Sequence, residues 1–552
     1  ADTPVESAQY PVYQRYTDIP GVTAEEIEAI EALKAQHSAL CIAMNHSTEA
    51  FYRHDGTIGG YTSLFCEWLT GLFGIEFYPV IVEWDALIAG LASHEIDFTG
   101  ELTPTEERKS IYYMTDAIAE RSLKMFRLQD SETLRAINSE RLLNYAFLEG
   151  ATAAKYISDA SEYAFSTRYV QDYDEAVALL RAGQIDAFFE DGSAEAAFDK
   201  YDDITAEEYF PLIYTPVALS TGNPVFSPII SVVQKYLEHG AIFHLTDLYN
   251  LGEQAYQKQK LLLHLSDAER AYLDNRQDSI PIAAEYDNYP ASFYNETEEQ
   301  WQGIAHDVLA QISALTGLRF EIVNEPGENW SELLAALEAG QVALITELIP
   351  SKDRSESFLW PDDAYSVDNY ALISLSNQEN IRVNQIWYSA IALPRDTAFE
   401  TTFDMWFPNH QHVLRLDSID DCYAAIETGE ADFVMGSRNS MLSMTNYSEK
   451  PGFKVNILFN NTYESSFGFH VDEQTLCSII SQAQKLVDTE GITNHWVHRV
   501  FDYRAKMART QIPYLAAICL SLLLVLALFS VILIRRRKSG KELERLVERR
   551  TA

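Results

Sequence analysis

The sequence has few cysteines, and none of them is spaced for a metal site. There are five in 552 residues. Cys519 lies in a long apolar run, and Cys41, Cys66, Cys422 and Cys477 show neither CxxC spacing nor clustering with histidine. We therefore expect no metal. Four buried or free thiols are favoured over a disulfide framework, although the sequence leaves a single bridge open.

Basic residues are scarce as well. The chain has 41 Lys and Arg against 82 Asp and Glu, which gives a formal net charge of −41. Such a charge repels the phosphate backbone of DNA and RNA. Nucleic acid is therefore excluded as a partner of the bulk of the chain.

Catalytic motifs are absent too. The sequence contains no GxSxG, no HExxH and no glycine-rich phosphate loop. We expect neither a catalytic site nor a cofactor in these residues. A lytic enzyme activity stays a formal alternative, but nothing marks the catalytic Glu that it needs.

Apolar residues, in contrast, are plentiful. Hydrophobic residues make up 47% and aromatic residues 12%, beside only 18 Pro and 24 Gly. This composition can bury hydrophobic cores and is not typical of disordered or fibrous chains. At about 100 to 200 residues per domain, the length predicts about three to five compact units.

One apolar run is long enough to cross a membrane. Residues 512–534 are 23 residues without a charge, and at about 1.5 Å per residue they span a hydrocarbon layer of about 30 Å. A buried core helix is the alternative, but such helices seldom stay apolar on every face over this length. The last 18 residues hold eight Lys and Arg and three Glu, a net charge of 8 − 3 = +5. By the positive-inside rule, the cluster at 535–538 predicts a cytoplasmic C-terminus and extracytoplasmic N-terminal domains.

The chain contains an internal repeat. The segment from Trp84 to Arg108 aligns without gaps to the segment from Trp330 to Arg354, at an offset of 330 − 84 = 246. The same offset relates Gly183 to Gly429. Upstream, an offset of 243 relates Gly60, Gly74 and Phe77 to Gly303, Gly317 and Phe320. The sequence therefore predicts two domains of one fold, with a short loop insertion between the two offsets.

Within each copy, short β-like runs alternate with amphipathic helical patterns. The runs LCIAM and FYPVIV flank one helix of the first copy, and YAFLEG and IDAFFED flank another. This alternation predicts an α/β fold with two βαβ lobes in each copy. Ligands of open parallel sheets bind beyond the carboxyl ends of the strands, so we expect a cleft between the lobes.

These residues resemble the type 3 periplasmic solute-binding proteins, the bilobed Venus-flytrap modules that capture polar amino acids. The marks are GELTPTEER at 100–108, similar to the family's G-M-T-x-T-x-x-R run, and LLRAGQIDAFFED, which ends at Asp191. Two tandem flytrap domains followed by one transmembrane helix resemble the sensor region of BvgS-like hybrid histidine kinases. The expected organisation is an N-terminal extension (1–37), a first solute-binding domain (38–262), a linker (263–279), a second solute-binding domain (280–502), the transmembrane helix (512–534) and the start of a cytoplasmic signalling linker (535–552).

The first copy carries residues that suit an amino acid. Arg108 can hold a carboxylate by a bidentate fork, and Thr103 adds donors. From the other lobe, Thr152 follows a glycine turn that lets backbone amides approach the same carboxylate, while Asp191 can accept from the ammonium group. The resemblance implies the same roles. A solvated ion pair is the alternative for Arg108.

Some positions are ambiguous. Glu101 stands where the family has a small residue, and it could bind a basic ligand side chain, bind the ammonium or face solvent; a cationic ligand group is our preferred interpretation. Phe51 and Tyr52 stand where the family places an aromatic wall under the ligand, or they are core residues. Trp84 recurs as Trp330, which favours a fold-supporting role over a specificity role.

The second copy keeps the scaffold and loses part of this chemistry. Glu347, Ser351 and Arg354 stand at the positions of Glu101, Thr105 and Arg108, but Ser437 replaces Asp191 and the glycine turn becomes Asp396-Thr397-Ala398. We therefore predict that the second domain does not bind a free α-amino acid in the family's manner. It could bind another ligand or act as a relay.

The preferred function is the ligand-sensing region of a transmembrane signalling protein, with a histidine kinase as the expected output. The first domain is expected to bind an amino acid or similar small polar solute, and the protein is expected to be a single-pass cell-membrane homodimer. Because no Met or apolar leader begins the chain, a secretory signal is expected to have been removed. A membrane-anchored receptor for an ABC-type permease and a diguanylate cyclase output are the alternatives. The tail after the membrane helix suits a coiled-coil linker or a basic lipid anchor.

Overall fold

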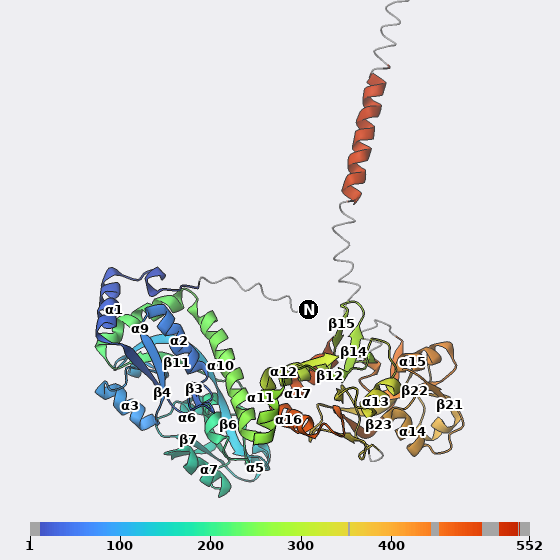
Figure 1. The fold of residues 1–552 in the computed structure, drawn as a ribbon, viewed down its shortest axis with the longest axis horizontal. Coiled ribbons are helices and arrows are strands. Elements are labelled where there is room, and N and C mark those ends of the chain that lie inside the picture. The colour runs from blue at the N-terminus through green and yellow to red at the C-terminus, as the bar shows by residue number, and fades with distance from the viewer. Residues whose placement is uncertain (1–11, 352–353, 443–451, 500–517, 539, 541–552) are drawn as a thin grey trace, which may run out of the picture. The chain divides into compact units, whose positions relative to one another are not determined.

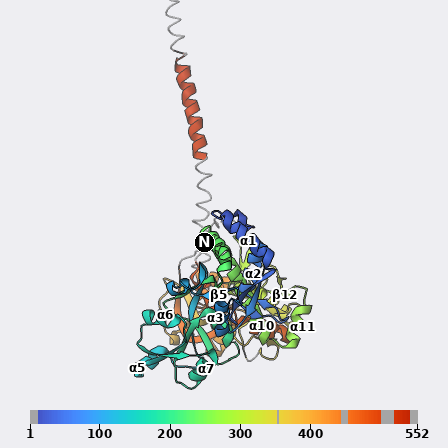
Figure 2. The same cartoon turned by 90° about the vertical axis from the view of Figure 1, so that its left-hand side faces the viewer.

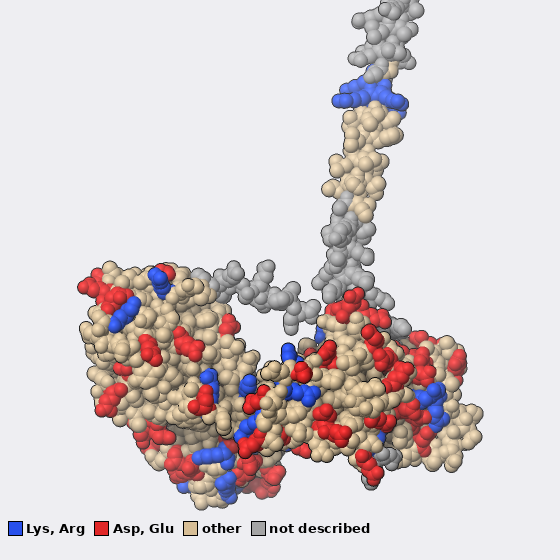
Figure 3. All heavy atoms as spheres, in the orientation of Figure 1, with Lys and Arg blue, Asp and Glu red and all other residues tan. Residues whose placement is uncertain are grey.

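The computed structural model describes residues 12–351, 354–442, 452–499, 518–538 and 540. The chain forms two compact units, Ala1–Ser266 and Asp267–Ala552. Each unit contains one copy of the repeat. The acidic excess of the composition is visible on the face drawn in Figure 3, where Asp and Glu outnumber Lys and Arg.

Nine strands form one continuous ladder in the first unit, in the order β4-β1-β5-β11-β6-β9-β7-β8, with β10 paired to β6. Strand β6 is shared between two lobes, because its first half pairs with β11 and its second half with β9 and β10. We call the lobe that contains β1, β4, β5 and β11 lobe 1, and the lobe that contains β7, β8, β9 and β10 lobe 2. The strands are β1 (Ala39–Met44), β4 (Glu76–Ile81), β5 (Phe98–Leu102), β6 (Tyr113–Leu128), β7 (Leu143–Leu148), β8 (Phe165–Val170), β9 (Ala187–Asp191), β10 (Ile204–Glu208) and β11 (Tyr214–Thr221), beside the hairpin of β2 (Phe51–Tyr52) and β3 (Ile58–Gly59).

Helices cover both lobes of this unit. Figures 1 and 2 show α1 and α2 on lobe 1 and α5 and α7 at the opposite end, on lobe 2. The bounds are α1 (Ala24–Gln36), α2 (Tyr61–Phe73), α3 (Trp84–Ser93), α4 (Glu106–Lys109), α5 (Leu134–Glu140), α6 (Ala153–Ala160), α7 (Tyr173–Arg181), α8 (Glu195–Phe198), α9 (Ser227–Glu238) and α10 (Ala241–His264). Each lobe has its own apolar core.

In the second unit, each lobe has a separate five-stranded sheet. Lobe 1 has the order β16-β12-β17-β24-β18 and lobe 2 the order β21-β20-β22-β19-β23, and a small sheet β13-β14-β15 accompanies them. The strands are β12 (Ile280–Ala283), β13 (Asp287–Asn288), β14 (Ser292–Asn295), β15 (Gln300–Gln302), β16 (Phe320–Ile322), β17 (Leu344–Ile345), β18 (Phe358–Leu359), β19 (Ser366–Leu375), β20 (Ile391–Pro394), β21 (Val413–Leu416), β22 (Phe433–Ser437), β23 (Phe453–Ser465) and β24 (Gly468–His470). The helices are α11 (Asp267–Asn275), α12 (Ile304–Thr316), α13 (Trp330–Glu338), α14 (Ala398–Trp406), α15 (Ile419–Thr428), α16 (Gln474–Gln484) and α17 (Thr489–His498).

The repeat predicted from sequence is confirmed at the level of single residues. Helices α2 and α12 are equally long and begin and end at matched glycines. Gly60 and Gly303 precede them with φ of 95° and 130°, and Gly74 and Gly317 end them with φ of 66° and 77°. Glycine adopts such angles at little cost, so the matched glycines mark matched helix ends. The chain therefore has two tandem bilobed α/β domains.

Gly60 gives a testable stability prediction. A Cβ at this position would lie 2.4 Å from the carbonyl oxygen of Glu49, in a backbone conformation that alanine avoids. We expect Gly60→Ala to lower the free energy of unfolding of the first domain by about 2–4 kcal/mol, measured by thermal unfolding of the purified chain. Gly71→Ala in the same helix meets no atom within 4 Å and serves as the control, with unchanged or slightly raised stability. Equal melting of both variants would contradict the prediction.

The structure adds detail to two segments of the expected organisation. Helix α1 of the N-terminal extension packs into the first core through Ile30 and Leu33. The linker expected at 263–279 contains α11.

All five cysteines are free, and Cys519 alone among them is exposed.

One helix, Ile518–Lys538, is long and apolar enough to be a candidate membrane span. It ends in the Lys and Arg cluster that Figure 3 shows in blue. The first six residues of the predicted span, 512–517, and nearly all of the tail after 538 lie outside the described residues.

Candidate functional site

In both domains, the residues of interest follow the carboxyl ends of strands. In the first domain Glu101 lies in β5, Thr152 follows β7 and Asp191 ends β9. In the second, Glu347 follows β17 and Thr397 follows β20. This is the edge at which open parallel sheets bind ligands.

Between the lobes of the first domain lies Arg121, a residue of β6 that the sequence analysis did not single out. Its Nε and Nη2 donate to the two carboxylate oxygens of Glu49 at 2.7 and 2.8 Å. Its Nη1 donates to Glu101 at 2.7 Å and to Asp191 at 3.2 Å. We call these four residues the Arg121 cluster. Because Glu49 and Glu101 belong to lobe 1 and Asp191 to lobe 2, the guanidinium joins the lobes.

The cluster is deeply buried. The side chain of Arg121 is 1% exposed and that of Glu101 is 4% exposed. Burial alone would lower the pKa of Arg121, but the surrounding carboxylates raise it well above its ordinary value, so it stays charged. Burial raises the pKa of Glu101 against the opposing attraction of Arg121. Burial and the neighbouring Asp191 raise the pKa of Glu190 to about 8.

The predicted residues Arg108, Thr103 and Thr152 of the first domain are not part of the Arg121 cluster. The Arg108 guanidinium lies 6.0 Å from the centre of the Trp84 ring and donates to the carbonyl of Thr103 at 3.4 Å. Thr152 is the N-cap residue of α6, and its side chain makes no capping hydrogen bond.

The two predicted aromatic residues differ in burial. Phe51 is buried with Ala196 and Tyr256, while Tyr52 is 53% exposed. The structure therefore places Phe51 in a core that contains residues of both lobes and leaves Tyr52 at the surface.

The second domain has no counterpart of Arg121. In the first ladder Leu123 pairs with Asp191, and in the second Tyr370 pairs with Ser437. Two residues earlier along each strand stand Arg121 and Asp368. The cation is therefore replaced by an acid, which accepts from the amide of Asn439 at 2.8 Å.

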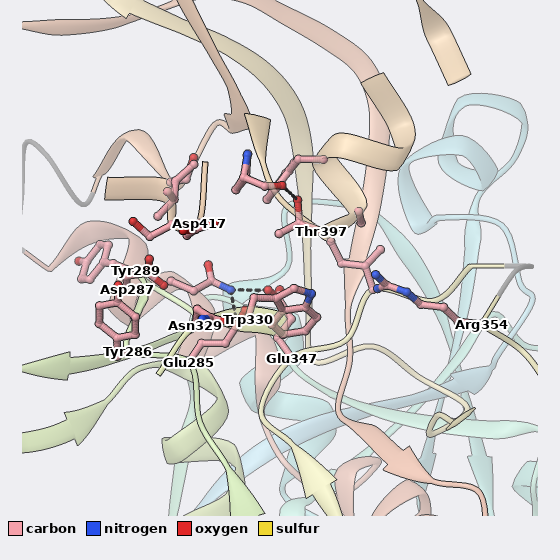
Figure 4. A pocket seen from close by; sticks show the side chains of 18 residues that line it. Glu285, Tyr286, Asp287, Tyr289, Asn329, Trp330, Glu347, Arg354, Thr397 and Asp417 are labelled. Carbon is pink, nitrogen blue, oxygen red and sulfur yellow. Dashed lines mark hydrogen bonds between the residues drawn. The ribbon is translucent and has the colours of Figure 1, made fainter. Parts of the chain in front are cut away.

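Instead, the second domain has an open pocket between its lobes (Figure 4). Residues from the ends of β12, β17, β20, β21 and β22 contribute to it. Arg354 is the one basic side chain among the described residues that line it. The lining residues are Glu285, Tyr286, Asp287, Asn288, Tyr289, Asn329, Trp330, Glu347, Ile349, Arg354, Pro394, Thr397, Ala398, Phe399, Asp417, Ser418, Ile419 and Ser440.

One side of this pocket is acidic. The amide of Asn288 donates to Glu285 at 2.6 Å and also to Glu347. Burial, reinforced by the charge of Glu347, raises the pKa of Glu285, and burial also raises the pKa of Glu347. Burial and the charge of Asp420 raise the pKa of Asp287 to about 7. Within the described part of the chain, no Lys or Arg forms an ion pair with these three carboxyls, whereas Glu101 in the first domain pairs with Arg121.

Arg354 lies on the other side, beyond the Trp330 ring in Figure 4. Its Nη2 donates to the carbonyl of Asp396 at 2.8 Å, and the Trp330 Nε1 donates to the same oxygen at 2.9 Å. Thr397, the N-cap residue of α14, lies beside them in the lining. A guanidinium and a helix N-terminus both attract an anion. The pocket thus offers an anion site and a cation site.

The turn after β20 in the second domain matches the turn after β7 in the first, which the offset alignment did not show. Asp396 stands at the offset of Gly150, and both residues have a positive φ, 60° and 80°. The turn is therefore retained although its sequence changed. Trp330 lines the pocket in addition to supporting the fold.

The remaining predicted positions of the second domain lie outside the lining. Ser351 accepts from the amide of Arg354 at 3.2 Å through its carbonyl. Ser437 is buried and its side chain accepts from the amide of Ser440, which does line the pocket, at 2.9 Å. Glu285, Asp287 and Thr397 were missed, because charge matching across lobes is visible only once strand register is known. Among the described residues, no group of three or more His, Cys, Asp or Glu is placed to hold a metal ion.

A family model described as bacterial extracellular solute-binding proteins, family 3, matches residues 40–204 and 280–502. The chain belongs to this family. The two matched segments fall in the two domains and cover more than half of the chain, so the tandem solute-binding arrangement predicted from sequence is confirmed. No curated protein matches the sequence.

Several solved structures are similar in fold. The periplasmic domain of BvgS from B. pertussis aligns with 88% of this chain and 96% of its own, at 16% identity and a TM-score of 0.43. A histidine kinase sensor domain with similarity to periplasmic binding proteins covers 41% of this chain and 99% of its own, at 13% identity and a TM-score of 0.38. The arginine-, lysine-, histidine-binding protein ArtJ from Geobacillus stearothermophilus covers 41% and 97%, at 16% identity and a TM-score of 0.36. At these identities the likeness concerns the fold alone.

Proposed function

We propose that the chain is the ligand-sensing part of a transmembrane signalling protein and that its second domain binds a small solute with one carboxylate and at least one cationic group, such as a basic amino acid. The carboxylate would bind Arg354 and the first turn of α14. The cationic group would bind among Glu285, Asp287 and Glu347, with Tyr286 and Trp330 offering aromatic faces.

The observation that carries this proposal is the different charge balance of the two clefts. Glu101 and Glu347 are counterparts at an offset of 246. Glu101 is neutralised by Arg121, whereas Glu347 shares an amide donor with another carboxyl. Buried carboxylates without a cation are unfavourable, so a solute cation that enters the second cleft relieves this cost. Binding through these acids differs from the family's manner, in which the Asp191 position supplies the anion.

The first domain, which the sequence favoured, is the second candidate site. Arg108 supports it, because among the described residues no carboxylate lies close enough to form an ion pair with this half-buried guanidinium. A solute carboxylate could bind there. Asp191 and Glu101, however, already bind Arg121, which leaves the solute's ammonium group fewer partners.

Domain order supports a signalling role for the whole protein. We propose that closure of a ligand-binding domain is relayed through the second domain to the helix Ile518–Lys538, with the C-terminus cytoplasmic and a dimeric histidine kinase as output. The segment between the second domain and this helix, residues 500–517, lies outside the described residues. A solute receptor for a permease and a diguanylate cyclase output are the alternatives. A permease receptor would need no signalling helix after its anchor.

A thermal-shift titration with a matched pair of variants tests the binding site. At 100 times its Kd, L-arginine or L-lysine should stabilise the purified full chain by about 2.7 kcal/mol, and L-glutamate should not. Glu347→Gln should remove the shift, while Glu101→Gln, its counterpart in the first domain, should keep it. Loss of the shift in Glu101→Gln alone would move the site to the first domain, and no shift with any solute would refute the proposal.

The pKa of Asp287 predicts a pH dependence of binding. The raised value means that Asp287 is protonated below about pH 7, and a solute cation prefers the ionised form. The affinity should therefore rise by about tenfold from pH 6 to pH 8, with proton release on binding at the lower pH. Calorimetry in buffers of different ionisation enthalpy measures both quantities. Asp287→Asn should flatten the profile, and a flat profile in the parent chain would contradict the prediction.

A further inference from the structure

The first domain contains an arrangement that the proposed solute site does not use. Arg121 supplies, from within the chain, the cation that a solute would otherwise bring to the cleft. Its guanidinium makes four hydrogen bonds to carboxylates: Glu49 accepts two of them as a bidentate pair, and Glu101 and Asp191 both accept from Nη1. Such forks are among the strongest ion pairs in proteins because they combine charge with fixed geometry.

The contacts of this guanidinium reach both lobes. Glu101 lies in β5 of lobe 1, where its second oxygen accepts from the amide of Asn45 at 2.9 Å. Asp191 ends β9 of lobe 2, where its other oxygen accepts from the amide of Ser193 at 3.1 Å. Each carboxylate is therefore fixed to its own lobe, and the shared guanidinium holds the two lobes together.

A backbone hydrogen bond also joins the two lobes beside the cluster. The amide of Thr48 in lobe 1 donates to the carbonyl of Ser193 in lobe 2 at 2.9 Å. Phe51 of lobe 1 is buried with Ala196 of lobe 2 and with Tyr256. These contacts exist only when the lobes are together.

Helix α10 contacts both lobes as well. Toward lobe 1, Tyr249 donates to Glu49 of the Arg121 cluster at 3.1 Å. Toward lobe 2, Lys260 forms ion pairs with Glu195 and Asp199, both at 2.9 Å, and Tyr256 donates to Asp199 at 2.5 Å. The closed arrangement thus includes the last helix of the first domain.

We infer that the first domain is held closed by its own Arg121, which takes the place of a bound solute cation, so that closure of this domain does not depend on a ligand. The second domain is expected to depend on a ligand for closure, because Asp368 stands there at the register position of Arg121. The first domain is then a constitutively closed part of the sensor, and its closed state is communicated to α10. This inference is independent of which solute the second domain binds.

Distance measurements between spin labels on the two lobes test the inference. Ala89 in α3 and Ser158 in α6 are exposed and lie in lobe 1 and lobe 2. Labels at Ala89→Cys and Ser158→Cys, in the full chain with Cys519→Ala, report the lobe separation by pulsed electron resonance. Without solute, we expect a narrow distribution that millimolar basic amino acid leaves unchanged. In Arg121→Met we expect a broader distribution shifted by several ångströms to longer distance.

Two further variants accompany the distance measurement, one as a control and one as a substitute for Arg121→Met. Arg127→Met removes a guanidinium from the same strand whose hydrogen bonds go only to lobe 2, to the carbonyls of Asp186 and Glu132, and it should keep the narrow distribution. If Arg121→Met does not fold, Asp191→Ala, which removes the acceptor of Arg121 in lobe 2, should still broaden the distribution. A wild-type distribution that is broad without solute, or that narrows when solute is added, would overturn the inference. So would an unchanged narrow distribution in both Arg121→Met and Asp191→Ala.

Discussion

Replacement of Arg121 by Met is expected to cause a large loss of stability of the first domain. It leaves the carboxylates of Glu49, Glu101 and Asp191 without their cation, and the first two are almost completely buried. Breaking a buried ion pair by removing one partner costs about 3–5 kcal/mol, because the remaining charge is buried and unpaired. For a domain of this size the melting temperature should fall by on the order of 10 °C. Differential scanning calorimetry of the purified chain measures the change.

A compensating variant separates loss of charge balance from loss of packing. The triple variant Glu49→Gln, Glu101→Gln and Arg121→Met removes two anions together with the cation, and it should regain most of the lost stability. Arg127→Met, on the same strand, should cost only about 1–2 kcal/mol, the loss of hydrogen bonds to two backbone carbonyls, and it leaves no carboxylate unpaired in the Arg121 cluster. If the triple variant were no more stable than Arg121→Met, unpaired charge would not be the cause.

Replacement of Arg354 by Met is expected to have the largest effect on solute binding. Arg354 is the one basic side chain among the described residues of the pocket lining, and its hydrogen bond within the chain goes to a carbonyl rather than to a carboxylate. Loss of one partner of a buried charge pair costs about 2–5 kcal/mol. The affinity for a basic amino acid should therefore fall by about 30-fold or more. Isothermal titration of the full chain measures it.

The control for this variant is an arginine of the same domain that lies away from the pocket. Arg382 is exposed, beside the short helix Val383–Tyr388, and Arg382→Met should leave the affinity unchanged. An affinity in Arg354→Met within a factor of three of the parent chain would mean that the solute carboxylate binds elsewhere.

The repeat made most of the fold predictable from sequence. Glycines at helix ends, such as Gly60 and Gly303, mark a backbone geometry that few other residues tolerate, so they preserve register when other positions change. Apolar runs then predicted strands such as β1 and β4 within a residue or two. Local patterns of this kind depend on neighbours in sequence, which is why sequence reasoning found them.

The site was less predictable, because it depends on pairing across strands. Glu101 was expected to bind a cationic group of the ligand, and in the structure it pairs with Arg121, a residue 20 positions later in the chain. Nothing in the local sequence of β6 shows that Arg121 reaches Glu49 and Asp191. Likewise, Asp396 preserves the turn of Gly150 by its conformation and not by its residue type. The binding roles assigned from sequence to Arg108, Thr103 and Thr152 stay predictions.

A structure of the full chain determined with a bound basic amino acid tests the central claim most directly. The account predicts solute density in the second domain, with its carboxylate at Arg354 and Thr397 and its cationic group at Glu347, and an unchanged Arg121 cluster in the first domain. Density in the first domain between Arg108 and Asp191, with Arg121 displaced and the second pocket empty, would contradict it.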